Sequence, residues 1–148
     1  MTMPLRALLL VSIALGTTAC ARQIDDGAPC NTDSDCGGDV CARDLLCFPA
    51  DEVHAVTIHW TIDGAAPTAT SCAALTPFEV GYSIGDDDVT RVLFDPVPCN
   101  VGAFPIDKWP KSYTTAVVVA HYAFYTAPIA PDDSASVTID LTVPPASP

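Results

Sequence analysis

The sequence predicts an all-β protein, in which an antiparallel β-sandwich follows a small disulfide-rich module. Valine, threonine, isoleucine and proline are plentiful in the 148-residue chain, whereas the helix-favouring lysine, glutamate, glutamine and methionine are scarce. Apolar and polar residues alternate in short runs, which are separated by turns rich in aspartate, glycine and proline. Four of the seven cysteines are crowded between Cys30 and Cys47, which is typical of a disulfide framework.

The strands are expected between residues 53 and 143. Alternating or apolar runs occupy residues 56–62, 78–84, 89–94, 104–106 and 137–143. The long apolar run 113–125 is expected to be one central strand, covered on both faces. No segment predicts an amphipathic helix. About six or seven short strands in one domain predict an immunoglobulin-like or prealbumin-like β-sandwich.

The cysteine count predicts three disulfides. Cys20 stands apart near the N-terminus, and an even number remains beyond it. Cys72 and Cys99 are isolated in the sequence, so we expect them to pair with each other. The clustered cysteines are Cys30, Cys36, Cys41 and Cys47. They allow three pairings, and the sequence alone does not choose among these; we favour the interleaved one, first with third and second with fourth.

The N-terminal segment has the three-part layout of an export signal. Arg6 is followed by the apolar run 7–15 and by small residues up to Ala19. With Cys20 next, the segment resembles a bacterial lipoprotein signal, and the resemblance implies that Cys20 becomes the lipidated first residue. Three acyl chains form a lasting anchor at about 0.8 kcal/mol per buried CH₂. The alternative is a secreted protein with Cys20 as a free thiol.

Two further patterns resemble envelope lipoproteins of gliding soil bacteria. The spacing Cys-x₅-Cys-x₄-Cys-x₅-Cys, with Asp-Ser-Asp before the second cysteine, looks like the cysteine-rich modules that follow the lipid anchor there. The sandwich domain that follows such modules is similar to this chain in the order Trp60, Cys72, Cys99-Asn-Val-Gly-Ala-Phe104 and Tyr113. The resemblance implies location and architecture, and it implies no defined activity.

We therefore expect five parts along the chain. They are a signal peptide (1–19), a lipid-anchored tether (20–29), a disulfide-rich module (30–50), a β-sandwich (51–143) and a disordered tail (144–148). The module is too small for a hydrophobic core and depends on its disulfides. Ala21 and Arg22 lack the aspartate that retains many lipoproteins at the inner membrane, which favours the outer membrane.

The charge excludes some partners. Eighteen acidic residues stand against six basic ones, for a formal net charge of −12. Such a chain is expected to bind neither nucleic acid nor anionic lipid head groups. With 49% hydrophobic and only 16% charged residues, it is expected to fold.

One motif suggests catalysis. Residues 81–85 match Gly-x-Ser-x-Gly, the nucleophile elbow of serine hydrolases. That elbow needs a strand, a sharp turn and then a helix. Ser83 is instead expected at an outward-facing strand position before an acidic turn. A small serine hydrolase is therefore the least favoured function, and we expect no enzyme.

Metal sites are not expected. His54, His59 and His121 lack the spacing of zinc ligands. We expect His59 to face solvent, and His54 to share the face of Val56 and Ile58. Asn31-x-Asp33-x-Asp35 is similar to the start of a calcium loop, but Cys36 replaces the required glycine and Ala42 the final acid. These side chains are better explained as turn formers.

The candidate ligand-binding residues are Trp109, Asp86, Asp87 and Asp88. Trp109 is expected in a loop with its ring exposed, while Trp60 alternates in phase with the core aliphatics. The three aspartates form a turn, and acidic loops at sandwich ends sometimes hold calcium. A carbohydrate- or calcium-dependent binding module is therefore the alternative function. The first is a non-enzymatic envelope lipoprotein for adhesion, scaffolding or recognition, anchored to the membrane at Cys20, with an unknown protein or glycan partner and no cofactor.

Overall fold

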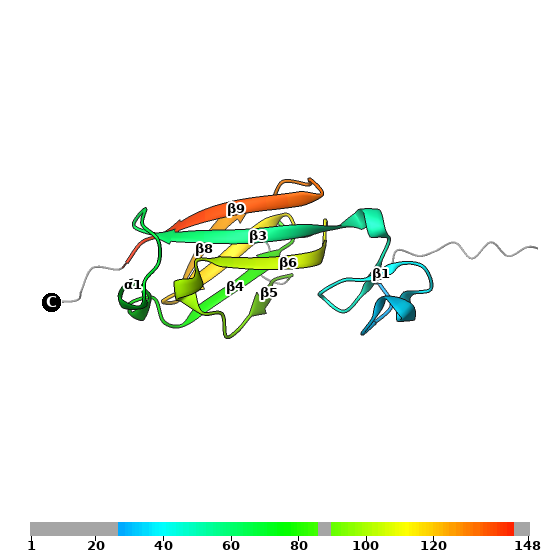
Figure 1. Cartoon of the computed structure of the whole chain (residues 1–148), viewed down its shortest axis with the longest axis horizontal. Helices are drawn as coiled ribbons and strands as arrows, with labels where there is room; N and C mark the ends of the chain where they lie inside the picture. Colours follow the sequence, from blue (N-terminus) through cyan, green and yellow to red (C-terminus); the bar gives the residue numbers. More distant parts are fainter. Residues whose placement is uncertain (1–26, 86–89, 144–148) are drawn as a thin grey trace, which may run out of the picture.

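The computed structural model describes residues 27–85 and 90–143 (Figure 1). The signal peptide, Cys20, the turn Asp86-Asp87-Asp88 and the tail 144–148 lie outside the described residues. The described elements are η1 (Asp33–Cys36), β1 (Val40–Cys41), β2 (Cys47–Phe48), η2 (Ala50–Glu52), β3 (Val53–Ile62), α1 (Ala69–Ala73), β4 (Phe78–Ser83), β5 (Val92–Phe94), η3 (Cys99–Val101), β6 (Ala103–Pro110), β7 (Thr115–Ala120), β8 (Ala123–Pro128) and β9 (Ser134–Leu141).

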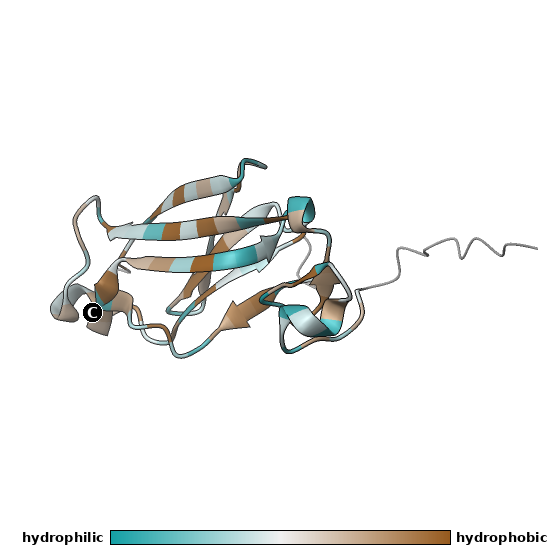
Figure 2. Cartoon of the chain, turned by 45° about the vertical axis from the view of Figure 1, so that its right-hand side comes forward, coloured by the Kyte–Doolittle hydropathy of each residue, from teal (hydrophilic) through white to brown (hydrophobic). Residues whose placement is uncertain are grey.

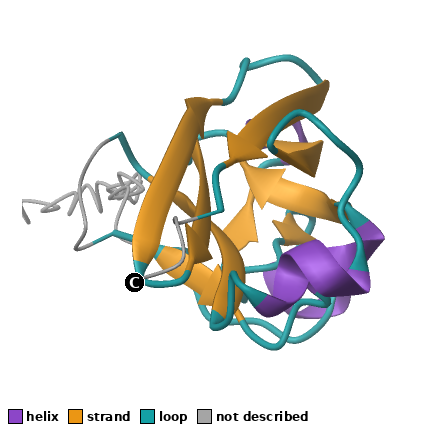
Figure 3. Ribbon diagram, turned by 90° about the vertical axis from the view of Figure 1, so that its left-hand side faces the viewer, coloured by secondary structure: helices purple, strands orange, loops and turns teal. Residues whose placement is uncertain are grey.

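The predicted sandwich is present. One sheet has the strand order β6-β3-β9 and the other β5-β4-β7-β8. Viewed from the end that carries α1, the strands surround a common interior (Figure 3). All pairs are antiparallel except β3 with β9, which run parallel. The predicted antiparallel sandwich is therefore confirmed, with this parallel pair as its one exception among the described strands.

Period-two patterning builds the core. In β3 and β9 every second residue is buried, and Figure 2 shows the matching alternation of hydrophobic and hydrophilic bands. Trp60 lies in this core, as predicted, and its ring centroid is 5.1 Å from that of Phe78 in the opposite sheet. Burying side chains of this size contributes about 1.5–3 kcal/mol each. The strand alternation therefore accounts for the joining of the two sheets.

The run 113–125 is not a single strand. It forms β7 and β8, joined by a tight turn at His121 and Tyr122, whose φ angles are +47° and +65°. Every residue of β7 is buried, whereas β8 is an edge strand with four exposed residues out of six. The sequence lacks the Asn-Gly or Asp-Gly pair that usually marks such a turn, so the apolar run reads as continuous.

One short helix was not expected. α1 begins after Thr68, whose hydroxyl accepts a hydrogen bond from the Ser71 amide at 3.1 Å. Its five residues place Cys72 opposite η3, so that Cys72 and Cys99 form a disulfide with a Cα–Cα distance of 5.8 Å. The predicted pairing of these two cysteines is confirmed.

Candidate functional site

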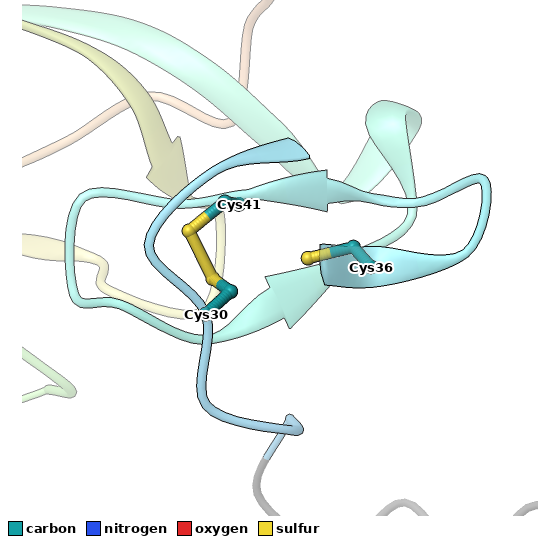
Figure 4. Close-up of side chains that lie close together, drawn as sticks. All are labelled: Cys30, Cys36 and Cys41. Atoms are coloured by element: carbon teal, nitrogen blue, oxygen red, sulfur yellow. A yellow bond between two sulfur atoms is a disulfide. The ribbon is translucent and has the colours of Figure 1, made fainter. Parts of the chain in front are cut away.

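The disulfide module (residues 30–50) has the interleaved pairing that we favoured. Cys30 pairs with Cys41 and Cys36 with Cys47, each across eleven positions. Figure 4 shows Cys36 beside the Cys30–Cys41 bond, and the three Sγ atoms lie within 4.8 Å of one another. This cluster has the composition of a metal site, but its sulfur atoms are joined in disulfides and do not offer thiolates, which are the metal-binding form. Three disulfides indicate an extracellular or periplasmic protein.

The acidic side chains of the module are hydrogen-bonded within it. Asp35 accepts hydrogen bonds from the amides of Asn31 and Thr32, both at 2.9 Å. These bonds lower the pKa of the Asp35 carboxyl below its ordinary value. The amide of Cys41 donates to Asp33 at 3.0 Å. The oxygens that suggested a calcium loop therefore hold the backbone of a turn around η1.

Two ion pairs join the module to β6. Lys108 Nζ lies 2.6 Å from Asp33, and Arg43 Nε lies 2.7 Å from Asp107. The Arg43 amide also donates to the Lys108 carbonyl at 3.2 Å. The hydrogen bond from Lys108, followed by that from the Cys41 amide, lowers the pKa of Asp33. A cleft of about 190 Å³ lies between these groups, but its charges already neutralise one another in pairs.

Trp109 does not form an exposed binding surface. It lies in β6, and its side chain is fully buried. The ring centroids of Tyr82 and Tyr113 lie 4.4 Å and 4.8 Å from its own. The Trp-Pro pair at the end of the strand predicts a loop, but β6 is an edge strand, where proline is tolerated. The prediction of an exposed, ligand-binding Trp109 is therefore wrong, and the ring belongs to an aromatic cluster between the sheets.

Ser83 is not placed as an exposed nucleophile. It lies on the face of β4 opposite the core residues Val80 and Tyr82, as alternation predicts, but it is only 2% exposed, so the predicted exposure is wrong. Its Oγ donates a hydrogen bond to the Gly85 carbonyl at 2.8 Å. Within residues 27–85 and 90–143, no histidine is hydrogen-bonded to it. The Gly-x-Ser-x-Gly match is thus the end of a strand with a local side-chain bond.

The three histidines do not converge. His54 and His59 lie on opposite faces of β3, and His121 lies in the turn between β7 and β8 of the other sheet. His54 is buried, as its shared parity with Val56 predicts, and its Nδ1 is 2.8 Å from the Asp132 carbonyl oxygen. His59 lies on the face of β3 opposite the core, as expected, and is half-buried. No shared metal site results from them.

A wide groove lies at the end of the sandwich opposite the module. Its volume is about 540 Å³, and it runs between α1 and the segment 95–100. Phe78, Pro77 and Pro96 line it together with the Cys72–Cys99 disulfide, and Asp95 is the one acidic side chain among its lining residues. The volume falls in the range of small-molecule sites. The other polar lining residues of the groove are Thr76 and Asn100.

The most exposed aromatic side chains are not that of Trp109, the one expected to be exposed, but those of Tyr122 and Phe124. Tyr122 is 78% and Phe124 is 57% exposed. The guanidinium of Arg91 lies 4.3 Å from the Phe124 ring centroid, so that ring is covered on one face. Because the run 113–125 reads as one covered strand, its pattern does not predict that these side chains are exposed.

Comparison with protein-family models, with curated proteins and with solved structures finds no match. Of the helices in the described part of the chain, none has the length and apolar character needed to cross a bilayer.

Proposed function

We propose that this chain is a non-enzymatic envelope protein, held to the outer membrane by a lipid on Cys20, whose β-sandwich serves adhesion, scaffolding or recognition. The observation that carries the proposal is the complete pairing of the six cysteines between Cys30 and Cys99. Because the chain has seven cysteines, Cys20 has no cysteine left within it to pair with. A lone thiol after a signal-like segment is the acceptor that lipid attachment requires.

The geometry supports a binding rather than a catalytic role. The buried hydroxyl of Ser83, the residue of the Gly-x-Ser-x-Gly match, is used locally in a bond to the Gly85 carbonyl. The titratable groups with shifted pKa values, such as Asp33, Asp35 and Asp140, are engaged in ion pairs or turns. Active sites usually gather such groups in a cleft, whereas here they are distributed along the molecule.

The module stands between the tether and the sandwich. The disulfide module adjoins one end of the sandwich, and α1, which lines the groove, lies at the other (Figure 1). The turn that carries Tyr122 is bonded to the α1–β4 loop through the His121 amide. A lipid on Cys20, which precedes the module in the chain, would leave this end of the sandwich farther from the membrane than the module. Such an arrangement would leave this end accessible to a partner, which supports a recognition role.

The test is the intact mass and membrane partition of the exported protein. We expect a mass increase of one diacylglyceryl group and one acyl chain, with a further increase of six hydrogens on reduction and unfolding. Cys20→Ser should release the protein from the membrane fraction, whereas the neighbouring Thr17→Ser should leave it there. An unmodified N-terminus with Cys20 free would contradict the lipid anchor, and free thiols at the other six positions would contradict export.

A further inference from the structure

The two sheets have four edge strands, which are β6 and β9 in one sheet and β5 and β8 in the other. An edge strand presents backbone N–H and C=O groups that can pair with another chain. Natural proteins prevent this with short strands, prolines, bulges or charged side chains. The presence or absence of these features therefore indicates whether an edge is closed or open to a partner.

Three of the four edges carry such protection. β5 has only three residues. β6 contains Pro105 and Pro110, and its pairing with β3 is shifted between His54 and Val56. β8 ends in Pro128 after six residues. Each of these strands is therefore a poor template for a further strand.

β9 lacks these protections. It pairs with β3 over all eight residues, in parallel and without a shift, from Ser134 to Leu141. It contains no proline, lysine or arginine, and its one charged residue is Asp140. The carboxylate of Asp140 accepts hydrogen bonds from Thr61 Oγ1 at 2.6 Å and from the Gly64 amide at 2.9 Å. These two bonds hold the Asp140 carboxylate on the side of β3, so its charge does not protect the free edge from pairing.

Two hydrogen bonds at the ends of β9 show which of its residues point their backbone groups toward β3. The Asp133 carbonyl accepts a bond from Ala55, and the Leu141 carbonyl accepts one from Asp63. Because backbone direction alternates along a strand, the odd-numbered residues point their N–H and C=O groups toward β3. The residues that point outward are Ser134, Ser136, Thr138 and Asp140. Among the described residues, no other segment forms a backbone bond with them.

We propose that the free edge of β9 binds the β9 edge of a second copy of this chain, antiparallel and about a two-fold axis. The outward-pointing residues then pair Ser136 with Thr138 and Ser134 with Asp140, and Val137 lies on the axis. No like charges stand opposite each other in this register. The inward-facing side chains of β9, which include Ile139, are already buried within each copy, so the contact rests on backbone pairing.

A second copy fits this edge better than another extended partner, because the contact is self-complementary. Two chains with a net charge of −12 repel each other, so a contact between them is favoured where the facing surfaces carry no charge. Residues 134–139 are uncharged, and Asp133, just before them, is neutralised by Lys111 Nζ at 3.1 Å. A closed two-fold contact also uses up both edges and stops further growth.

The contact is expected to be weak in solution. Pairing over one strand buries less surface than a stable interface of about 1,200–2,000 Å². Tethering of both copies to one membrane, which belongs to the proposed function, would raise their effective concentration. The pairing itself does not depend on that tether, so the test can be made without it.

The first experiment is sedimentation velocity of the exported chain carrying Cys20→Ser, which removes both the lipid and any intermolecular disulfide through that thiol. We expect a concentration-dependent monomer–dimer equilibrium. Ser136→Lys places two lysines diagonally across the two-fold axis and should raise the dissociation constant at least about tenfold. Ser34→Lys makes the same change at an exposed residue of η1, in the disulfide module, and should leave the equilibrium unchanged.

The second experiment is amide hydrogen exchange as a function of protein concentration. At low concentration the amides of Val137 and Ile139 should be protected by β3, whereas those of Ser136 and Thr138 should exchange quickly. At high concentration the latter two should become protected in the parent protein and stay fast in the folded Ser136→Lys variant. A monomer at every concentration, or equal dimerisation of the two lysine variants, would overturn the proposal.

Discussion

At the scale of single residues, two tyrosines carry the same hydroxyl in opposite surroundings. Tyr82 is fully buried among the rings of Trp109 and Phe94, and its hydroxyl has no hydrogen-bond partner among the described residues. Tyr125 is partly buried, and its hydroxyl donates to the Thr142 carbonyl at 3.1 Å. Comparing the two tyrosines therefore distinguishes the free-energy cost of burying an unpaired hydroxyl from the free-energy gain of hydrogen-bonding one.

We predict that Tyr82→Phe leaves the free energy of unfolding unchanged or raises it, because an unsatisfied buried hydroxyl is lost. The matched variant Tyr125→Phe should lower it by about 0.5–1.5 kcal/mol, because a made hydrogen bond is lost. Urea denaturation at neutral pH compares the two. A larger loss for Tyr82→Phe than for Tyr125→Phe would show that the Tyr82 hydroxyl has a partner after all.

The burial of the Tyr82 hydroxyl also predicts a loss of stability at alkaline pH. Burial raises the pKa of the Tyr82 hydroxyl, because the charged phenolate is poorly solvated between the sheets. A raised folded-state pKa stabilises the fold fully below the unfolded value of about 10, and this contribution is lost as the pH rises further. Stability should therefore fall above about pH 10, and Tyr82→Phe should reduce that fall. If the free energy of unfolding fell equally with pH in the parent protein and in Tyr82→Phe, ionisation of Tyr82 would not be the cause.

The residue scale also shows what sequence can predict about the candidate site. Trp60 lies in a period-two run, so its burial is predictable from the residues beside it. Trp109 lies in an edge strand whose register shifts against β3, and no local pattern reveals that shift. Ser83 faces outward as its parity predicts, but it is buried, and its hydroxyl bonds the Gly85 carbonyl. Parity is local information, whereas exposure depends on the whole fold.

At the scale of elements, the turn between β7 and β8 has a strained backbone that is held in place by hydrogen bonds. His121 and Tyr122 both have positive φ, which costs roughly 1–2 kcal/mol for each residue with a Cβ. The His121 amide donates to the carbonyls of Leu75 and Pro77, both at 3.1 Å, so the turn is held against the α1–β4 loop. The fold thus keeps a strained pair where Asn-Gly would be relaxed.

We predict that His121→Asn combined with Tyr122→Gly raises the free energy of unfolding by about 1 kcal/mol, after the added chain entropy of glycine is subtracted from the relieved strain. Urea denaturation measures it. Thr126→Gly, in the middle of β8 where φ is negative, is the control and should destabilise by about 0.5–1 kcal/mol. Equal losses in both variants would mean that the turn is not strained.

Element prediction succeeded where one face of a strand is buried and the other is open. β3 and β9 alternate residue by residue, so their patterns indicate both strand and face. β7 is buried on both faces, and the apolar run continues from β7 into β8. Without a turn motif between them, the sequence does not predict the hairpin. The parallel pairing of β9 with β3 joins segments that are distant in sequence, and no local pattern encodes such a choice.

At the scale of the whole molecule, the module and the sandwich are stabilised by different means. The hydrophobic core consists of sandwich residues only, from Val56 to Leu141. The module has two disulfides and meets the sandwich through exposed ion pairs such as Lys108–Asp33. Exposed ion pairs contribute about 0–1 kcal/mol each. The sandwich should therefore depend little on the module, and much on its own disulfide.

We predict that replacing Cys72 and Cys99 together by alanine lowers the free energy of unfolding of the sandwich by about 3.5 kcal/mol, as chain entropy gives for a loop of 27 residues. Replacing the four module cysteines, from Cys30 to Cys47, should lower it by no more than about 1 kcal/mol, because only surface contacts are lost. Both tryptophans lie in the sandwich core, so tryptophan fluorescence in urea reports on the sandwich alone. A module variant that lost as much stability as the Cys72/Cys99 variant would mean that the two parts fold as a single cooperative unit.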